Sequence, residues 1–326
     1  MDKVICRKIL YGDEGIKRFL DEIFANGWFT PGSKQIVIKP NLCTLATVES
    51  GIITDISFVK TLVSFIKSKS PSSQIKIIES DSFDRTAEEV FEKLGYCDLA
   101  REEGVDLINL TKMRSIPLAF SEIPYEINLP FIFLEDIFYI SIANLKTHDY
   151  QKVTCGFKNQ FGCIPDVLKE RYHPYLDEVL YYLDGLINPD LSIVDGRIAL
   201  EGNGPVDGEP IKCDSMIAGN SSLSVDTVCA RVAGFDPVKV PYLRYAYKKT
   251  GYNPSNIEVV GDKLDFNFKF IPDKLFNGIR LKIFVIRTSN IITNFSKKVL
   301  FHLYYYGFIA TARIAPKSIM KKIRKT

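Results

Sequence analysis

Short apolar runs rich in β-branched residues alternate along the chain with segments whose apolar residues recur at helical spacing. The predicted strands are residues 35–38, 74–78, 105–110, 137–143 and 191–194. The predicted helices are residues 54–68, 86–103, 173–186 and 224–233. Such alternation is typical of βαβ units, so the sequence predicts an α/β fold with a mainly parallel sheet and flanking helices.

Charge is distributed unevenly over the 326 residues. Residues 274–326 contain twelve Lys or Arg and no Asp or Glu, whereas the preceding 273 residues hold the other 30 basic and all 39 acidic side chains. We therefore expect two units: an α/β catalytic-like domain over 1–273 and a basic, aromatic-rich amphipathic tail over 274–326.

An apolar stretch in this tail, residues 299–312, is shorter than the roughly 20 residues that span a bilayer. Its basic flanks favour a segment that lies in the interface of an anionic membrane. Packing of an apolar helix face on the body is an alternative. Binding of nucleic acid through basic and aromatic side chains is less favoured.

Seven scattered cysteines without a Cys-x-x-Cys pair indicate reduced thiols and provide no ligand set for an iron–sulfur cluster. The first residues lack the apolar region of a signal peptide. The expected location is therefore the cytoplasm, with the tail holding the protein peripheral to the membrane. No Walker motif or Gly-x-Gly-x-x-Gly motif supports a nucleotide site.

Polar residues stand at the ends of four predicted strands. They are Lys39-Pro40-Asn41, Glu79-Ser80-Asp81, Asn144-Leu145-Lys146-Thr147-His148 and Asp195-Gly196. Because parallel strands present their carboxyl ends at one edge of the sheet, we expect these residues to converge in one cleft. Lys39 and Lys146 would make that cleft suitable for a phosphate or carboxylate.

The catalytic centre is predicted where scarce residue types follow the apolar run 137–143. The candidate catalytic residues are His148, Lys158, His173 and Lys146. Histidine carries protons near neutral pH, so His148 is the expected acid–base group. An alternative is a divalent-metal site formed by His173, Asp195 and Glu79.

The residues expected to bind the substrate surround this centre in the sequence. They are Lys39, Asn41, Asn144, Thr147, Thr154, Asn159, Glu201 and Gly204. The last two open the glycine-rich segment 201–208, which is either a substrate loop or a plain surface loop.

The motifs above resemble, in their order along the chain, those of domain of unknown function family 362. The resembling order continues with Thr154 to Gly162, His173 and Glu201 to Pro205. The resemblance covers roughly residues 35–240. Many members carry a cysteine-rich, ferredoxin-like segment that is missing here, so the resemblance implies no iron–sulfur redox role for this chain.

The order of His148, Lys158 and His173 is also distantly similar to that in nickel-dependent lactate racemases. This resemblance implies Lys158 as the anchor of a nickel pincer, His173 as a nickel ligand and His148 as a general base. Acid–base chemistry by the same residues without the pincer is preferred.

We therefore expect an isomerase, epimerase or lyase acting on an anionic small molecule or a lipid-linked anion. A metal-dependent or redox protein and a non-catalytic, membrane-associated binding protein are the two alternatives.

Overall fold

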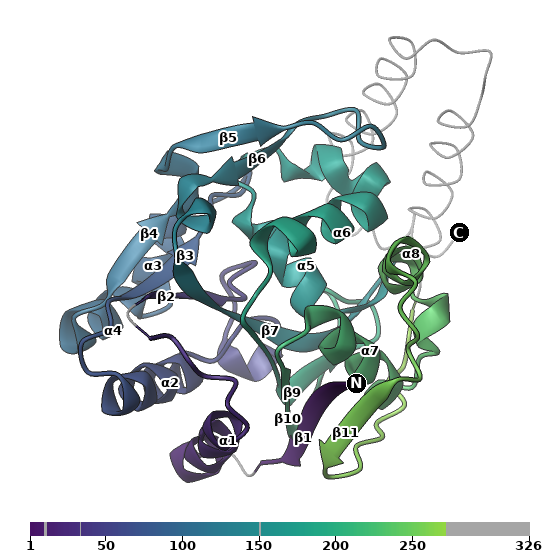
Figure 1. The fold of residues 1–326 in the computed structure, drawn as a ribbon, viewed down its shortest axis with the longest axis horizontal. Coiled ribbons are helices and arrows are strands. Elements are labelled where there is room, and N and C mark those ends of the chain that lie inside the picture. The colour runs from purple at the N-terminus through teal and green to yellow at the C-terminus, as the bar shows by residue number, and fades with distance from the viewer. Residues whose placement is uncertain (10–11, 33, 150, 272–326) are drawn as a thin grey trace.

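A mainly parallel sheet lies between two layers of helices (Figure 1). The structure is a computed structural model, which describes residues 1–9, 12–32, 34–149 and 151–271. The predicted tail over 274–326, and the domain boundary before it, lie outside these residues. The α/β class and the mainly parallel sheet are confirmed.

The main sheet has the strand order β11-β1-β10-β9-β7-β2-β3-β4, with β8 paired to β7. Its strands are β1 (Asp2–Lys8), β2 (Gln35–Pro40), β3 (Ile75–Glu79), β4 (Asp106–Asn109), β7 (Ile137–His148), β8 (Lys152–Thr154), β9 (Leu191–Glu201), β10 (Glu209–Gly219) and β11 (Ile257–Gly261). Among the described strands, β10 and β8 pair antiparallel with their neighbours, and the pairs β9–β7, β7–β2, β2–β3 and β3–β4 are all parallel. A separate hairpin pairs β5 (Ser115–Leu118) with β6 (Ile127–Pro130).

The helices divide into two groups, one on each face of the sheet. The first group is α1 (Asp13–Ala25), α2 (Ile56–Lys69), α3 (Ala87–Lys93) and α4 (Tyr96–Glu103). The second group is α5 (Gly156–Gln160), α6 (Leu176–Ile187), α7 (Ser222–Val232) and α8 (Pro241–Thr250). The 3-10 helices are η1 (Val48–Ser50), η2 (Leu110–Lys112), η3 (Phe131–Leu134), η4 (Phe161–Cys163), η5 (Lys169–Tyr175) and η6 (Pro237–Lys239).

Alternation of side chains along the strands separates the core into two halves. Ile36 and Ile38 pack with α1–α4, whereas Val37 packs with α5–α8. Both faces are covered, which explains why the strands read as nearly continuous apolar runs in the sequence. No helix of the described residues is long and apolar enough to cross a bilayer.

Two strands extend beyond their predicted ends. The strand predicted at 137–143 continues to His148, and the strand predicted at 191–194 continues to Glu201. Asp195-Gly196 is therefore not a strand end but the middle of β9, where Asp195 is paired in register with Asn144. The helix predicted from Asp55 begins as expected, with the Asp55 carboxylate accepting from the Ser57 amide at 2.8 Å.

Candidate active site

A cavity of about 270 Å³ opens at the carboxyl ends of β2, β3 and β7. Lys39, Glu79 and Lys146 come from these three strands, while α5 and η5 supply Lys158 and His173. Residues far apart in the sequence thus meet at the sheet edge where ligands bind in open α/β folds. Its volume suits a small ligand.

The alternation of side chains along β7 decides which residues of its polar end reach the cavity. Asn144, Lys146 and His148 line it, because residues two apart on a strand point to the same face. Leu145 and Thr147 do not line it. β8 turns back against this end, with His148 opposite Lys152 in an antiparallel hairpin.

The short helix α5 is held at its amino end by a buried carboxylate. The side chain of Asp226 accepts from the backbone amides of Gly156 at 2.7 Å and Phe157 at 3.1 Å. It also accepts from the hydroxyl of Tyr242 at 2.8 Å. Burial raises the pKa of Asp226 to about 7. This carboxylate fixes the turn of backbone that carries Lys158 into the cavity.

Asn159, next to Lys158, ties α5 to the sheet. Its side-chain amide donates to the carbonyl of Lys39 at 3.0 Å, to the Ser141 hydroxyl at 2.9 Å and to the carbonyl of Ile142 at 3.2 Å. Asn159 lines the cavity, as Thr154 does, but its amide nitrogen is engaged by the protein. Its evident role is to position the helix.

Burial lowers the pKa values of both histidines and of Lys158 in this cavity. Burial lowers the pKa of His148; the carboxylate of Asp149, 2.6 Å from Nδ1, opposes this shift, and Lys158 and Lys146 add to it. Burial followed by the charge of Lys158 lowers the pKa of His173 well below its usual value. The pKa of Lys158 falls to about 8, mainly through burial. Lys158 can therefore exchange protons near neutral pH, where the lowered pKa values favour the neutral, basic form of both histidines.

Phe161 organises the same centre. Its ring stacks on that of His173 with centroids 5.4 Å apart and planes 17° apart. The ammonium of Lys158 lies 4.0 Å from the centroid of this ring, a cation–π contact. One aromatic side chain thus sets the positions of both groups.

The cavity is rich in cations. Those that line it are Lys39, Arg85, Lys146, Lys158 and Lys169, against the carboxylates of Glu79 and Glu170. Lys39 and Glu79 pair at 2.7 Å and are almost fully buried, so this lysine is neutralised within the protein. Lys39 was predicted to bind the anion; its ammonium is instead engaged by Glu79 and by the carbonyl of Pro40. The remaining cations still exceed the carboxylates and suit an anionic ligand.

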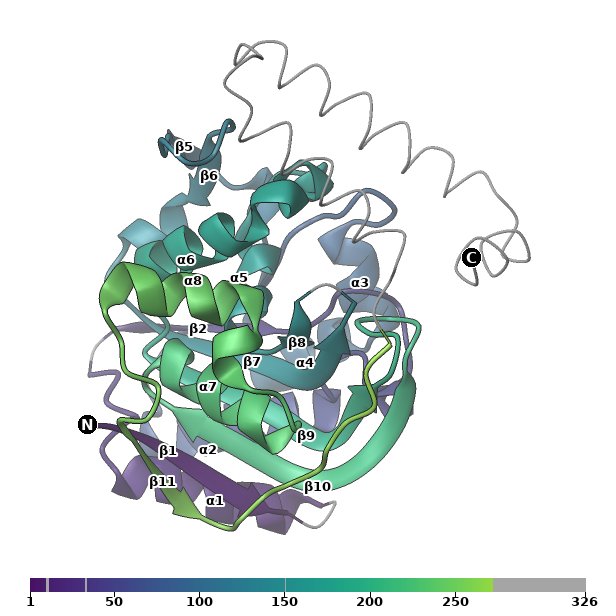
Figure 2. The same cartoon turned by 90° about the vertical axis from the view of Figure 1, so that its right-hand side faces the viewer.

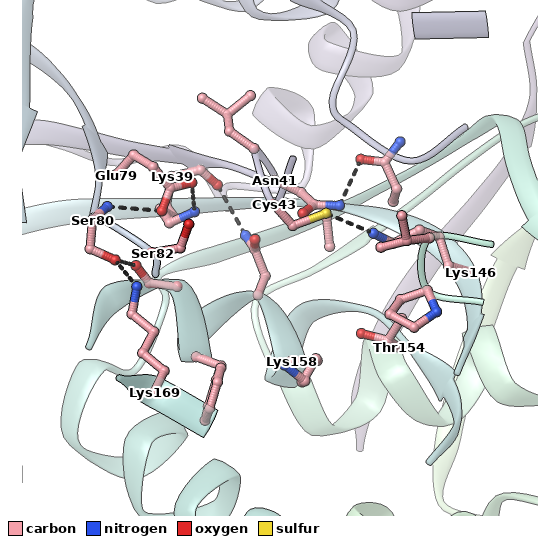
Figure 3. Close-up of a pocket in the computed structure, with 18 of the residues that line it drawn as sticks. Lys39, Asn41, Cys43, Glu79, Ser80, Ser82, Lys146, Thr154, Lys158 and Lys169 are labelled. Carbon is pink, nitrogen blue, oxygen red and sulfur yellow. Dashed lines mark hydrogen bonds and ion pairs between the residues drawn. The ribbon is translucent and has the colours of Figure 1, made fainter. Parts of the chain in front are cut away.

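Lys146 and Lys169 lie at two ends of the cavity (Figure 3). Lys146 donates to the carbonyl of Ile52 at 2.9 Å. Lys169 donates to the Ser80 hydroxyl and to the carbonyl of Asp81, both at 2.6 Å, and burial lowers its pKa to about 8. In Figure 3, Lys158 lies between them.

Lys169 and Arg85 were missed by sequence reasoning. Lys169 stands four residues before His173 in η5, and this proximity is the one signal that pointed to it. Arg85 follows β3 in an irregular loop, where it pairs with Asp84 at 2.8 Å. Nothing in its sequence neighbourhood distinguishes it from an ordinary surface arginine.

Asn41 and Asn144 line the cavity but also bind each other. The amide of Asn41 donates to the side-chain oxygen of Asn144 at 3.3 Å and to the carbonyl of Ile52 at 3.0 Å. Asn144 in turn donates to the carbonyl of Ile53 at 2.9 Å. Both side chains therefore hold the segment between β2 and α2 against β7.

Three residues predicted to bind the substrate do not line the cavity. Thr147 is fully buried on the other side of β7, with its hydroxyl 3.2 Å from the carbonyl of Gly202. Gly204 packs so closely on this threonine that a Cβ atom would lie 2.1 Å from its carbonyl oxygen. Glu201 pairs with Lys269 at 3.2 Å. The glycine-rich segment does reach the cavity, through Pro205 and Val206.

The structure does not bring the predicted metal ligands together. Glu79 binds Lys39, and Asp195 lies outside the cavity, paired with Arg197 at 2.7 Å. His173 lines the cavity without either as a co-ligand. Within the described ranges, no group of three or more His, Cys, Asp or Glu side chains has the arrangement of a metal site. This donor set therefore does not fit a divalent ion.

The nickel pincer implied by the racemase resemblance would use other residues. Lys158, His173 and His148, to which that resemblance assigns roles, line one cavity. The residues needed to hold such a group are thus together, and its binding stays a prediction.

The fold and the cavity define an α/β protein with a cationic site at the carboxyl edge of its sheet. The family model described as domain of unknown function (DUF362) matches residues 36–231, and the chain belongs to this family. The matched region holds most residues of the cavity, including both histidines and Lys158. The predicted family membership is confirmed.

Two further proteins are similar to parts of this chain. A thylakoid-associated protein from Synechocystis sp. is 34% identical over 127 residues, which is 37% of this chain and 39% of that protein. This chain therefore matches about two fifths of its relative. The lactate racemase apoprotein from Thermoanaerobacterium thermosaccharolyticum aligns over 72% of this chain and 57% of its own, with 14% identity and a TM-score of 0.47. The distant similarity to lactate racemases is thus found again, and a likeness this remote carries no mechanism.

Proposed function

We propose that this protein is an enzyme that performs acid–base chemistry, of the isomerase, epimerase or lyase type, on a small organic anion. The observation that carries the proposal is the cavity in which His148, His173 and Lys158, all with lowered pKa values, lie among cationic side chains. Such reactions need a neutral base and a proton donor, and the lowered histidine pKa values and the pKa of about 8 for Lys158 suit these two roles.

His148 is the acid–base group in this proposal. The carboxylate of Asp149 lies 2.6 Å from Nδ1, and its charge favours a proton at Nδ1, which leaves Nε2 as the basic nitrogen. That nitrogen takes a proton from a carbon next to the anionic group of the substrate. Lys158, as an ammonium, returns a proton to the product.

Lys146, Lys169 and Arg85 bind the anionic group. All three line the cavity, and Lys146 and Lys169 occupy its two ends. A cation near the substrate carbon also stabilises the negative charge that develops when the proton leaves. The ammonium of Lys39 is paired with the buried carboxylate of Glu79, so Lys39 has a structural role in the site.

A location at a membrane surface is part of the proposal. Support comes from the basic tail over 274–326 and from the relative that is named as thylakoid-associated. A lipid-linked anion would be a natural substrate for an enzyme in this position.

Deuterium exchange tests the proposed chemistry. The full chain is incubated in D2O with a panel of small carboxylates and organic phosphates, and mass spectrometry follows deuterium incorporation at carbon. For any compound that exchanges, His148→Gln should reduce the rate by about 10²–10⁴-fold. Lys112→Met, which removes a surface lysine outside the cavity, should leave the rate unchanged.

Binding of inorganic phosphate, measured by calorimetry, is followed in parallel. A chain that binds phosphate and exchanges nothing in the panel would be a binding protein, and the enzymatic proposal would be wrong. Stoichiometric metal in the purified protein would instead favour the metal-dependent alternative.

A further inference from the structure

Large apolar side chains are exposed on the loops that line the cavity. Eleven such side chains are exposed in the described part of the chain, and five of them lie on four loops that contribute lining residues. These five, which we call the rim, are Leu45, Phe83, Val167, Leu168 and Val206. Their exposed fractions range from 40% to 52%.

Each rim loop also contributes to the wall of the cavity. The loop with Leu45 supplies Cys43, and the loop with Phe83 supplies Ser82. Val167 and Val206 line the cavity themselves. Each rim side chain therefore belongs to the lining of the cationic cavity or stands within two residues of a lining residue.

The described chain also ends at this surface. The amide of Ile271, which is 56% exposed, donates to the carbonyl of Gly202 at 3.2 Å, and the amide of Gly202 donates to the carbonyl of Lys269 at 2.8 Å. Figure 2 shows the last described residues, in light green, running beside the loop between β9 and β10. The last described residue thus lies next to the loop that carries Val206, and it precedes by three positions the segment 274–326 with its twelve cations and no carboxylates.

We propose that the rim is a docking surface for an anionic lipid bilayer and that the cavity receives the anionic head group of an amphiphile in that bilayer. The docking on a bilayer is argued from the rim itself, and the binding of a head group rests on the anion-binding site proposed above. An apolar edge around a cationic floor matches a molecule with an anionic head and an apolar chain. Exposed apolar patches of this kind mark interaction sites.

Charge complementarity selects the bilayer as the occupant. Lys146, Lys158 and Lys169 inside the cavity attract anionic lipid, and so do the twelve basic residues of the tail. The rim adds an apolar contribution that salt does not screen, whereas the attraction of the tail falls as ionic strength rises. The two contributions can therefore be measured separately.

Flotation of the full chain with vesicles tests the docking surface. The vesicles contain phosphatidylcholine alone, or equal parts of phosphatidylcholine and phosphatidylglycerol. Leu45→Ser with Leu168→Ser, at 41% and 45% exposure, removes two rim side chains that do not line the cavity, and Leu134→Ser with Val238→Ser, at 52% and 46% exposure, is the matched control away from the cavity. All four side chains are exposed, so both variants should fold.

Binding of the wild type is expected on the anionic vesicles and weaker on phosphatidylcholine alone. The rim variant should partition about tenfold less at high ionic strength, where the tail is screened. The control should behave as the wild type does. Equal flotation of the rim variant and the wild type would overturn the proposal. A wild type that binds neither kind of vesicle would also overturn it, whether or not light scattering shows that the protein is a dimer.

Calorimetry with inorganic phosphate separates this proposal from the proposed function. Phosphate should bind the rim variant as it binds the wild type, because the cationic floor is unchanged. If vesicles bind and phosphate does not, the anion site and the head-group half of the proposal fail together while docking stands. If phosphate binds and vesicles do not, docking and the proposed membrane location fail together while the proposed acid–base chemistry stands.

Discussion

Replacing Glu79 by glutamine should destabilise the protein strongly, because it leaves the buried charge of Lys39 without its partner. The two side chains belong to residues that are 5% and 1% exposed, and their charged atoms are 2.7 Å apart. At an effective dielectric constant of 20, two unit charges at that distance attract by about 6 kcal/mol. Glutamine keeps a hydrogen-bond acceptor and loses the charge, so part of this attraction remains. Removal of one partner of a buried pair usually costs about 3–5 kcal/mol, and we expect a loss near 3 kcal/mol.

Urea unfolding, followed by circular dichroism, measures this loss. A surface pair provides the control: Arg18 and Glu14 are 2.6 Å apart with about four fifths of each side chain exposed. Glu14→Gln should change the free energy of unfolding by no more than about 0.5 kcal/mol. The contrast between the two variants isolates the effect of burial from the effect of charge.

A double-mutant cycle then tests the pairing itself. Lys39→Met removes the stranded ammonium, so the double variant Lys39→Met with Glu79→Gln should be more stable than Glu79→Gln alone. The expected coupling free energy is about 2 kcal/mol. A loss below about 1 kcal/mol for Glu79→Gln, with no recovery in the double variant, would refute the argument. Lys39 would then be well solvated and available to a ligand.

Three further results follow from the site. Gly204→Ala should lower the melting temperature, measured by calorimetry, because the new Cβ would lie 2.1 Å from the carbonyl oxygen of Thr147; an unchanged value would contradict this packing. Asp226→Ala should cost about 1–3 kcal/mol in urea unfolding, since it leaves two buried backbone amides without their acceptor, and a neutral result would exclude this role. Phosphate affinity should fall as pH rises through about 8, where Lys158 and Lys169 both lose their protons, and calorimetry from pH 7 to about 9 would show a flat profile if they do not bind the anion.

The parallel part of the sheet was predictable because its strands are buried on both faces. Five predicted strands became β2, β3, β4, β7 and β9. The antiparallel strand β10 escaped prediction, because its polar and apolar residues alternate irregularly and its pairing with β9 shifts between Lys212 and Ser215. Such a shift moves side chains between faces and removes the periodic pattern that sequence reasoning needs.

The polar end of β7 shows why the site was only partly predictable. Asn144, Lys146 and His148 have low strand propensity, so the sequence suggested a loop from residue 144 on. Pairing with β8 and β9 overrides that preference and keeps the segment extended. Thr147 was grouped with these residues by its place in the sequence, and strand alternation turns it away from them. The clustering of histidines and lysines in the sequence thus located the site, and the alternation of side chains along β7 determines which residues of that strand line it.

The low pKa values of Lys158 and His173 imply that ligand binding and proton uptake are coupled. Lys158 lowers the pKa of both histidines, and His148 lowers that of His173, so each proton in the cavity opposes the next. An anion placed among these groups offsets their repulsion and raises their pKa values together. Near pH 8 the substrate would therefore bring with it the proton that Lys158 lacks about half of the time. Above about pH 8 the empty cavity would hold mostly neutral bases and the filled cavity one base and one acid, which is the pairing that proton abstraction and return require.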